Sequence, residues 1–285
     1  TEILSLVNEN SVPIAIVDSN WTAMYRYLFP EVGVAFDITG ELPVAWMYKR
    51  TSDRSLDKSV RNFFEKIKKN GTLEKLINRY YQHAKSFDYV DTRAFLEKID
   101  NRLPNFIELF RKSAKETELD WLLLAAVSYQ ESHWDPEAKS PTGVRGLMML
   151  TIDTAKSLGV EDRLDPEQST LGGARYLAKM INKIPEGIQN EDRIWFALAA
   201  YNVGFGHVED ARKLTQLQGG DPDKWAEVSQ QLPLLEDENW HRKIVHGYAR
   251  GTETVKYVKN IRRYYDILKW KNAVRVVPAI NSPVL

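Results

Sequence analysis

Cysteine is absent from the 285-residue sequence, so disulfide bonds and thiolate metal sites are excluded. This absence does not identify a compartment, because cytosolic and periplasmic proteins can both lack cysteine. Long apolar runs are also missing: the most apolar one, Trp121 to Val127, is far shorter than the roughly 20 residues of a bilayer-spanning helix. The first residues show no basic-then-apolar signal peptide, and the chain begins at Thr1. We therefore expect a processed or truncated piece of a longer protein.

An excess of either charge is absent too, because 39 Lys and Arg balance 39 Asp and Glu. This excludes a global attraction to nucleic acid, and we expect no nucleic-acid partner. The five histidines are scattered, and only His241 and His246 lie near each other, so we expect no metal site. The one glycine-rich stretch, Gly204-Phe-Gly206, is too short a signal for a phosphate loop, and we expect no cofactor.

Residues 1–84 show mixed α/β patterning. Apolar runs at 12–17 and 43–48 predict short strands. Apolar residues at helical spacing predict helices over 55–68 and 72–82, separated by the break at Asn70-Gly71. Residues 85–100 are interpreted as a connector with a short helix over 92–99.

The rest of the chain shows helical periodicity and no strand-like alternation, which predicts an all-α domain over 101–270. A stretch of this size is large enough to fold alone. The tail 271–285 is expected to be a stray strand or disordered. The expected helices cover 104–117, 121–132, 152–158, 168–184, 191–201, 206–217, 222–230 and 252–268. The fold class is thus α+β multidomain, with a partial α/β domain followed by an all-α one.

Glu131 is the first candidate catalytic residue. Asp120 is a good N-cap for a helix that is apolar around most of its circumference and ends at Glu131. Burial and the negative end of the helix dipole both disfavour the carboxylate, so the pKa of Glu131 should be raised. A glycosidase acid needs this property. From these residues alone, an exposed helix-end glutamate paired with a lysine or arginine is the simpler explanation and stays open.

Three further segments support a functional interpretation. Glycines at 143 and 146 precede the short apolar segment Leu147 to Leu150, where backbone could approach a ligand closely. A Tyr201-Asn202 pair ends an apolar helix before Gly204, and Tyr257 lies on the last long helix. Each segment alone is also explained as a turn, a helix cap or a core aromatic.

In this order the segments resemble the family-1 lytic transglycosylases, which carry a soluble-lytic-transglycosylase-like domain. The family pattern is Glu-Ser, Gly-Leu-Met-Gln-Leu, Ala-Tyr-Asn and a late tyrosine, and the resemblance covers roughly residues 104–270. It implies a lysozyme-like fold with Glu131 as the catalytic acid and base. It also implies substrate contacts from the residues that match the motifs: Ser132, Met148, Met149, Tyr201, Asn202 and Tyr257.

One residue departs from the family pattern. Met149 stands where most members have glutamine, so the polar contact of that glutamine to sugar is lost. The Met148-Met149 version is similar to one branch of the family, which joins the lytic domain to an N-terminal domain like the amino-acid-binding periplasmic proteins (solute-binding family 3).

Residues 1–84 resemble the last part of such a binding domain, although they are too few for a complete two-lobed one. In that family the Asp that follows the equivalent strand binds a ligand's α-ammonium, and Asp18 is the matching position. Asp18 as a helix cap or turn residue stays open. The resemblance implies a muropeptide or amino-acid ligand here, and peripheral attachment to the outer membrane in the periplasm.

The resemblance implies cleavage of peptidoglycan without water. Hydrolysing glycosidases usually need two carboxylates. Four acids lie near Glu131 in sequence, but none matches a position the family uses for chemistry: Asp135, Glu137, Asp153 and Asp165. Glu131 alone would protonate the glycosidic oxygen and then accept the proton of the C6 hydroxyl, giving a 1,6-anhydro ring. Ser132 would polarise the acetamido group or position Glu131, and Tyr129 and Trp134 are either stacking surfaces or core residues. A goose-type hydrolytic lysozyme and a non-catalytic glycan-binding sensor are the alternatives.

Overall fold

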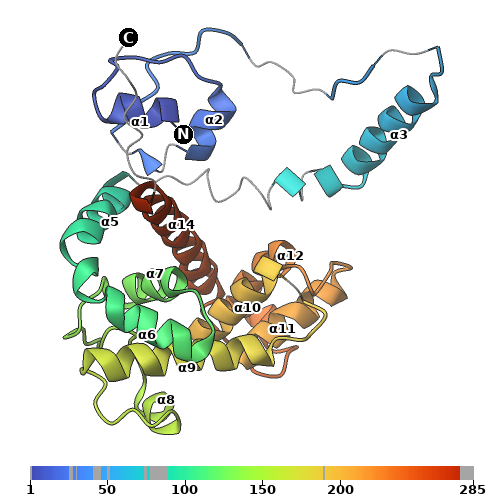
Figure 1. Ribbon diagram of the computed structural model, residues 1–285. Coiled ribbons are helices and arrows are strands. Elements are labelled where there is room, and N and C mark those ends of the chain that lie inside the picture. Colours follow the sequence, from blue (N-terminus) through green and yellow to red (C-terminus); the bar gives the residue numbers. More distant parts are fainter. Residues whose placement is uncertain are drawn as a thin grey trace. The chain divides into compact units, whose positions relative to one another are not determined.

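The computed structural model describes residues 2–25, 28–29, 31–40, 46–49, 52–73, 76–77, 89–188 and 190–276. The chain divides into two compact units, Thr1–Ala94 and Phe95–Leu285 (Figure 1). The division falls inside the segment expected to be a connector, and helix α5 (Tyr89–Asn101) runs across it. Within the described residues, no helix is both long and apolar enough to cross a membrane.

The described part of the N-terminal unit contains helices joined by irregular segments, and the expected α/β character is not confirmed. It contains α1 (Glu2–Asn8), α2 (Ser19–Tyr25) and α3 (Ser55–Lys69). The strand expected over 12–17 is not found: residues 14–18 have no regular structure, and Ile16 is 80% exposed. An extended segment needs a neighbouring strand for its backbone hydrogen bonds, and the described residues provide none here.

Two other N-terminal expectations fall partly outside the described residues. Of the strand expected over 43–48, residues 46–48 are described and have no regular structure. Trp46 packs instead against the aromatic face of α3, with its ring 4.9 Å from that of Phe64. Of the helix expected over 72–82, residues 72–73 and 76–77 are helical, and residues 74–75 and 78–82 lie outside the described residues.

The C-terminal unit is helical, as expected. The eight helices expected beyond residue 103 are all found, with ends shifted by a few residues, and short helices are added over 103–105 and 232–241. The elements are η3 (Leu103–Asn105), α6 (Ile107–Thr117), α7 (Trp121–Ser132), α8 (Ile152–Ser157), α9 (Pro166–Lys183), α10 (Asn190–Val203), α11 (Phe205–Leu217), α12 (Trp225–Gln231), η4 (Leu232–Glu236), α13 (Glu238–His241) and α14 (Gly251–Val276).

Helix α7 lies in the core of this unit, with α6 and α14 packed against it (Figure 1). Asp120 caps its start by accepting a hydrogen bond from the Leu122 backbone N–H at 2.8 Å, as expected. Residues 122–129 are all buried. The helix stops because His133 and Trp134 both adopt left-handed backbone conformations. The chain thereby reverses, and the buried Trp134 indole donates to the Ala125 carbonyl at 2.8 Å.

Helix α14 is longer than expected. It continues to Val276, so the described start of the tail, 271–276, is helical and not a stray strand; residues 277–285 lie outside the described residues. Its buried face holds the helix against α7, and the Tyr265 hydroxyl donates to the Asp120 carboxylate at 2.6 Å. Tyr257, earlier on the same helix, reaches the other end of α7.

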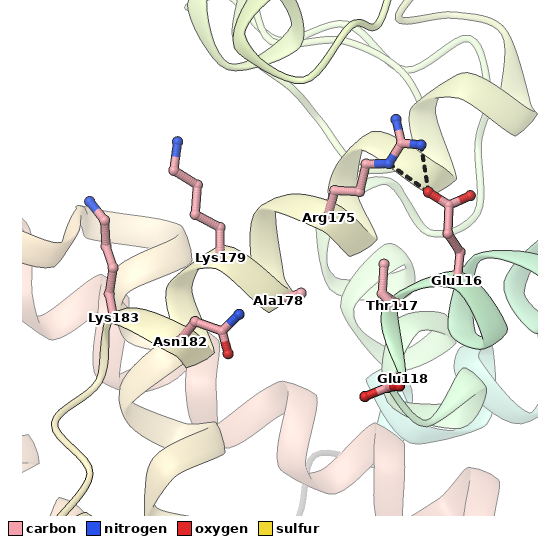
Figure 2. A pocket seen from close by; sticks show the side chains of 8 residues that line it. All are labelled: Glu116, Thr117, Glu118, Arg175, Ala178, Lys179, Asn182 and Lys183. Atoms are coloured by element: carbon pink, nitrogen blue, oxygen red, sulfur yellow. Dashed lines mark hydrogen bonds and ion pairs between the residues drawn. The ribbon is translucent and has the colours of Figure 1, made fainter.

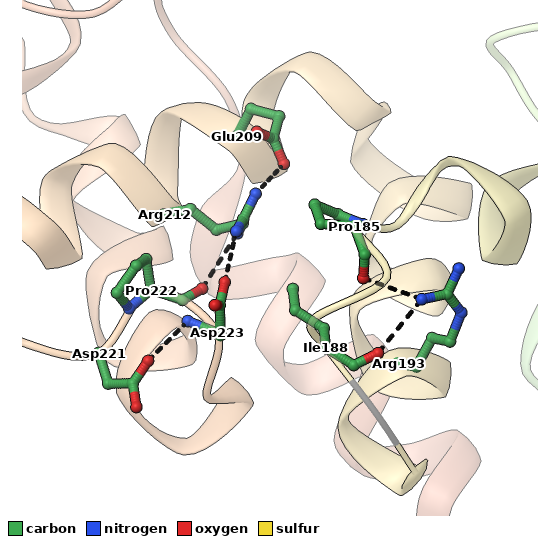
Figure 3. Close-up of polar contacts among 8 residues, drawn as sticks. All are labelled: Pro185, Ile188, Arg193, Glu209, Arg212, Asp221, Pro222 and Asp223. Atoms are coloured by element: carbon green, nitrogen blue, oxygen red, sulfur yellow. Dashed lines mark hydrogen bonds and ion pairs between the residues drawn. The ribbon is translucent and has the colours of Figure 1, made fainter.

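Helix α9 carries α6 on one side and α10 on the other. Arg175 of α9 forms an ion pair with Glu116 at the end of α6 (Figure 2). Two arginines fix the loops that follow (Figure 3): Arg193 donates to the carbonyls of Pro185 and Ile188, and Arg212 binds the Asp223 carboxylate and the Pro222 carbonyl. These contacts hold the loop before α10 and the loop after α11 in place.

Candidate active site

Glu131 lies in the last turn of α7, where the buried helix reaches the surface. The Tyr257 hydroxyl donates a hydrogen bond to its Oε1 at 2.5 Å. Burial raises the pKa of Glu131 to about 7, although the hydrogen bond from Tyr257 acts in the opposite direction. The carboxyl group is therefore half protonated near neutral pH and can donate a proton or accept one.

Two tyrosines flank this carboxyl group. Tyr257 of α14 is buried, and Tyr201 of α10 is partly exposed, with its hydroxyl donating to the Met148 carbonyl at 3.0 Å. Burial, together with the nearby negative charge of Glu131, raises the pKa of both hydroxyls well above its usual value. Both therefore stay protonated and act as hydrogen-bond donors.

Ser132 faces the interior. Its hydroxyl lies 2.9 Å from the Leu147 carbonyl, which also accepts from the Ser128 hydroxyl at 3.0 Å. The Ser132 Oγ in turn accepts the Asp135 backbone N–H. With 8% of its surface exposed, Ser132 joins the end of α7 to the 146–149 turn. This geometry favours positioning of Glu131 over contact with an acetamido group.

The 146–149 turn is built by two close approaches. Gly146 has a φ of +80°, and a Cβ there would lie 1.8 Å from the Arg163 carbonyl oxygen. The close approach expected at this glycine is therefore made, but to protein backbone and not to a ligand. Met148 is fully buried against Gly173, so its side chain does not line the site, contrary to the prediction. Met148 contributes to the site through its backbone carbonyl, which accepts the hydrogen bond from the Tyr201 hydroxyl.

Met149 and Asn202 remain at the surface of the site. Met149 is partly exposed and has a φ of +46°, a strained conformation for a residue with a Cβ. Such strain persists only where surrounding structure imposes it, as at functional sites. Asn202 is exposed, and its Oδ1 accepts a hydrogen bond from the buried Thr254 hydroxyl at 2.9 Å. This contact links the end of α10 to the start of α14.

The structure distinguishes the two roles that the sequence left open for Tyr129 and Trp134. Trp134 and Tyr129 are 0% and 1% exposed, so both are core residues and not stacking surfaces. Tyr176 of α9 was missed: its ring lies 5.1 Å from that of Tyr201 at an angle of 63°, and it is partly exposed. Helical periodicity predicted α9, which carries Tyr176 seven residues before Lys183. Only the packing of α9 on α10 shows that the face with Tyr176 reaches the site.

Two of the other acids near Glu131 in sequence have local structural roles. Asp135 accepts the Glu137 backbone N–H, and Asp165 caps α9 by accepting that of Gln168. Among the described residues, no group of three or more histidines, aspartates and glutamates could hold a metal ion. His246 instead lies 3.2 Å from the buried Asp210, which also accepts two backbone N–H groups and thereby fixes the loop before α14.

Asp18, the candidate ligand residue of the N-terminal unit, directly precedes α2. Its backbone carbonyl accepts the N–H groups of Trp21 and Thr22, and its side chain is exposed. This is the position of a residue that starts a helix.

Comparisons of the sequence with known proteins cover most of the same residues. Residues 108–223 match the family model of the transglycosylase SLT domain. The match includes Glu131, the 146–149 turn and Tyr201, whereas Tyr257 lies beyond it. The mostly helical chain thus carries a lytic-transglycosylase-type domain, and the resemblance inferred from the four motifs is confirmed.

Curated relatives are similar to this chain over most of its length. The chain is 51% identical over 265 residues to a membrane-bound lytic murein transglycosylase F of Photobacterium profundum, covering 93% of this chain and 51% of the relative. It is likewise 51% identical to the protein of the same name from Cronobacter sakazakii, covering 92% and 50%. The chain therefore spans about half the length of the curated relatives it matches. Among solved structures, it aligns with the 70 kDa soluble lytic transglycosylase of Escherichia coli at a TM-score of 0.43 and 25% identity, covering 58% of this chain and 24% of that one.

Proposed function

We propose that this chain is a peptidoglycan lytic transglycosylase that cleaves the β-1,4 bond between N-acetylmuramic acid and N-acetylglucosamine and leaves a 1,6-anhydro end. One observation carries the proposal: a single carboxyl group at the end of a buried helix, with a pKa of about 7 and a tyrosine hydroxyl fixed on one oxygen. The names of the relatives support the same activity.

The reaction needs one group that gives a proton and then takes one. Protonated Glu131 donates to the glycosidic oxygen, the C1–O bond breaks, and the oxygen of the substrate's own acetamido group stabilises the positive C1. The Glu131 carboxylate then accepts the proton of the C6 hydroxyl, whose oxygen bonds to C1 and closes the ring. The attacking hydroxyl is part of the substrate, so no second enzyme carboxylate has to activate water, and the entropy cost is small.

The remaining residues support this proton transfer. Tyr257 orients Glu131, and Ser132 holds the end of α7 on the 146–149 turn. Tyr201, Asn202 and Met149 provide the partly or fully exposed groups that line the path of the sugar.

Glu131→Gln tests the assignment. The variant keeps the shape and the hydrogen bond from Tyr257 but cannot exchange the proton, so activity on purified sacculi should fall by roughly 10²–10⁴-fold. Mass spectrometry of the wild-type products should show 1,6-anhydro-muropeptides, one water lighter than lysozyme products. Near wild-type clearing by the variant contradicts the role of Glu131, and reducing-end muramic acid as the main product means a hydrolase.

For the N-terminal unit, we propose a solute-binding-like domain in which Asp18 binds the ammonium group of a peptide or amino-acid ligand and regulates glycan cleavage. The support is the sequence resemblance and the exposed carboxylate. Regulation requires that the ligand bind one arrangement of the protein better than another. Calorimetric titration with cell-wall stem peptides, with turnover followed in parallel, tests this. Unchanged binding by Asp18→Ala makes Asp18 a turn residue, and binding without any change in turnover makes the unit a tether.

The name of the relatives also supports a location. We propose that the protein acts in the periplasm, attached peripherally to the outer membrane, where its substrate lies. Cell fractionation followed by salt and detergent extraction tests this. Recovery in the cytosolic fraction contradicts it.

A further inference from the structure

A buried threonine holds the exposed side chain of Asn202. Thr254 lies in the first turn of α14 and is fully buried, and its hydroxyl donates to Asn202 Oδ1 at 2.9 Å. The Arg250 carbonyl lies 3.1 Å from the same hydroxyl, but it already accepts the Thr254 backbone N–H at 3.1 Å. The hydroxyl proton is therefore available for Asn202.

This contact determines which way the Asn202 amide faces. A side-chain amide has one oxygen that accepts hydrogen bonds and one nitrogen that carries two N–H donors. Because the oxygen is turned to the Thr254 hydroxyl, the nitrogen lies on the other side of the amide group. Asn202 is exposed, and of the residues that the structure describes none accepts from its N–H donors. These donors are thus available to a ligand at the surface.

The amide belongs to the same site as Glu131. Asn202 directly follows Tyr201, which flanks Glu131. Tyr257, which donates to Glu131 Oε1 at 2.5 Å, lies three residues after Thr254 on α14. Residues three apart lie on one face of a helix, about 4.5 Å from each other along its axis. One face of α14 therefore holds both the carboxyl group that transfers the proton and the exposed amide.

The use of the Thr254 hydroxyl differs from that of comparable residues. A buried hydroxyl destabilises a fold unless it is hydrogen-bonded, and a carbonyl of the same helix is the nearest acceptor. The buried Thr170 and Thr215 both donate to such a carbonyl, one turn earlier on their own helices. The Thr254 hydroxyl instead reaches out of its helix to the exposed side chain of Asn202. This contact orients a group at the site, which the stability of α14 does not require.

We propose that Thr254 is a positioning residue for glycan binding, which fixes the Asn202 amide so that its N–H groups donate to an oxygen of the bound sugar. The proposal rests on the proposed function, because it takes the ligand to be a glycan. An amide that rotated freely would present its oxygen as often as its nitrogen. The contact with Thr254 orders the side chain before the sugar arrives, which lowers the entropy cost of binding.

The kinetic test uses Thr254→Val, which removes the hydroxyl and keeps the shape of the side chain. On soluble glycan strands the KM of this variant should rise about 5-fold with kcat unchanged, because the weakened contact acts equally on bound substrate and transition state. Thr254→Ser, which keeps the hydroxyl, should restore the wild-type KM. Thr215→Val is the matched control, because it removes a buried hydroxyl bonded only to its own helix, and its KM should not change. An unchanged KM in Thr254→Val, or a fall in kcat alone, overturns the proposal.

A double-mutant cycle shows whether Thr254 acts through Asn202. Asn202→Ala should raise KM about 10-fold, because the contact to the sugar is lost altogether. Adding Thr254→Val to Asn202→Ala should then raise KM no further, because no amide is left to orient. Multiplying effects of the two changes overturn the proposal, since Thr254 would then act on the glycan by another route.

Binding without turnover separates this proposal from the proposed function. Calorimetry with soluble oligomers of β-1,4-linked N-acetylglucosamine, in the Glu131→Gln background, measures binding alone. Thr254→Val should weaken this binding about 5-fold, as in the kinetic test. If the wild-type chain cleaves no glycan but this difference is found, the activity assignment fails and the positioning role stands. If glycan is cleaved and the oligomers bind equally well with and without the hydroxyl, the positioning role fails alone.

Discussion

The raised pKa of Glu131 lowers the free energy of unfolding when the carboxyl group is ionised. Glu131→Gln should remove this destabilisation. The pKa is about 7 in the folded protein and 4.5 ordinarily. At 1.36 kcal/mol for each pKa unit, the difference of about 2.5 corresponds to about 3 kcal/mol of destabilisation when the carboxylate is fully ionised. The glutamine keeps the acceptor oxygen for the Tyr257 hydroxyl and carries no charge to desolvate.

The effect depends on pH in a defined direction. Below about pH 4.5 the folded and unfolded chains both hold the proton, so the cost is absent. Between about 4.5 and 7 the unfolded chain releases its proton while the folded chain retains it, so the free energy of unfolding falls as the pH rises. Above 7 the cost is complete. The variant should therefore match the wild type at pH 4 and exceed it by about 3 kcal/mol at pH 8, or by roughly 6–12 °C in Tm for a unit of this size.

Urea unfolding at pH 4, 6 and 8, followed by circular dichroism, measures this difference. Glu137→Gln is the matched control, because it removes an exposed carboxylate six residues away and should show no such pH-dependent gain. A stability gain of equal size at all three pH values, or a loss at pH 8, would mean that the Glu131 carboxylate is well solvated. The proposed proton donor would then lack its physical basis.

Three other changes test the site. Tyr257→Phe removes a hydrogen bond that lowers the pKa of Glu131, so the alkaline limb of the pH profile of kcat/KM should move up by about 1 pH unit; an unchanged limb contradicts the role of Tyr257. Ser128→Ala and Ser132→Ala should each cost about 1 kcal/mol, but the double variant should cost more than the sum, because the Leu147 carbonyl then loses both hydroxyl donors; denaturant unfolding gives the coupling, and strict additivity refutes it. Gly146→Ala should destabilise far more than Gly143→Ala: both have positive φ, but only at 146 does a Cβ meet the Arg163 carbonyl. Equal melting temperatures for these two variants would contradict that packing.

The helices of the C-terminal unit could be predicted from the sequence because their signals are local. Asp120 and Asp165 cap helix starts, and apolar residues recur at helical spacing between such ends. The position of Glu131 follows from the same signals. The strand expected over 12–17 failed because strand formation depends on a partner elsewhere, which an apolar run does not reveal.

The detailed roles of the site residues could not be predicted, because they depend on contacts between distant segments. Ser132 and Met148 both match the family motif. The Ser132 hydroxyl nevertheless donates to the Leu147 carbonyl, and the Met148 side chain is buried against Gly173. Tyr176 belongs to no motif that we recognised, and only its packing on Tyr201 brings it to the site.

Two of the tyrosines of α14, Tyr257 and Tyr265, hold the two ends of α7 at a fixed spacing. Tyr265 contacts Asp120 at the start of α7, and Tyr257 contacts Glu131 at its end. A residue inserted or deleted between them would turn one tyrosine by about 100° relative to the other, so the two contacts could not form together. The segment between these tyrosines should therefore accept changes of residue type on its exposed side but not changes of length, and in evolution insertions should be confined to the loops outside it.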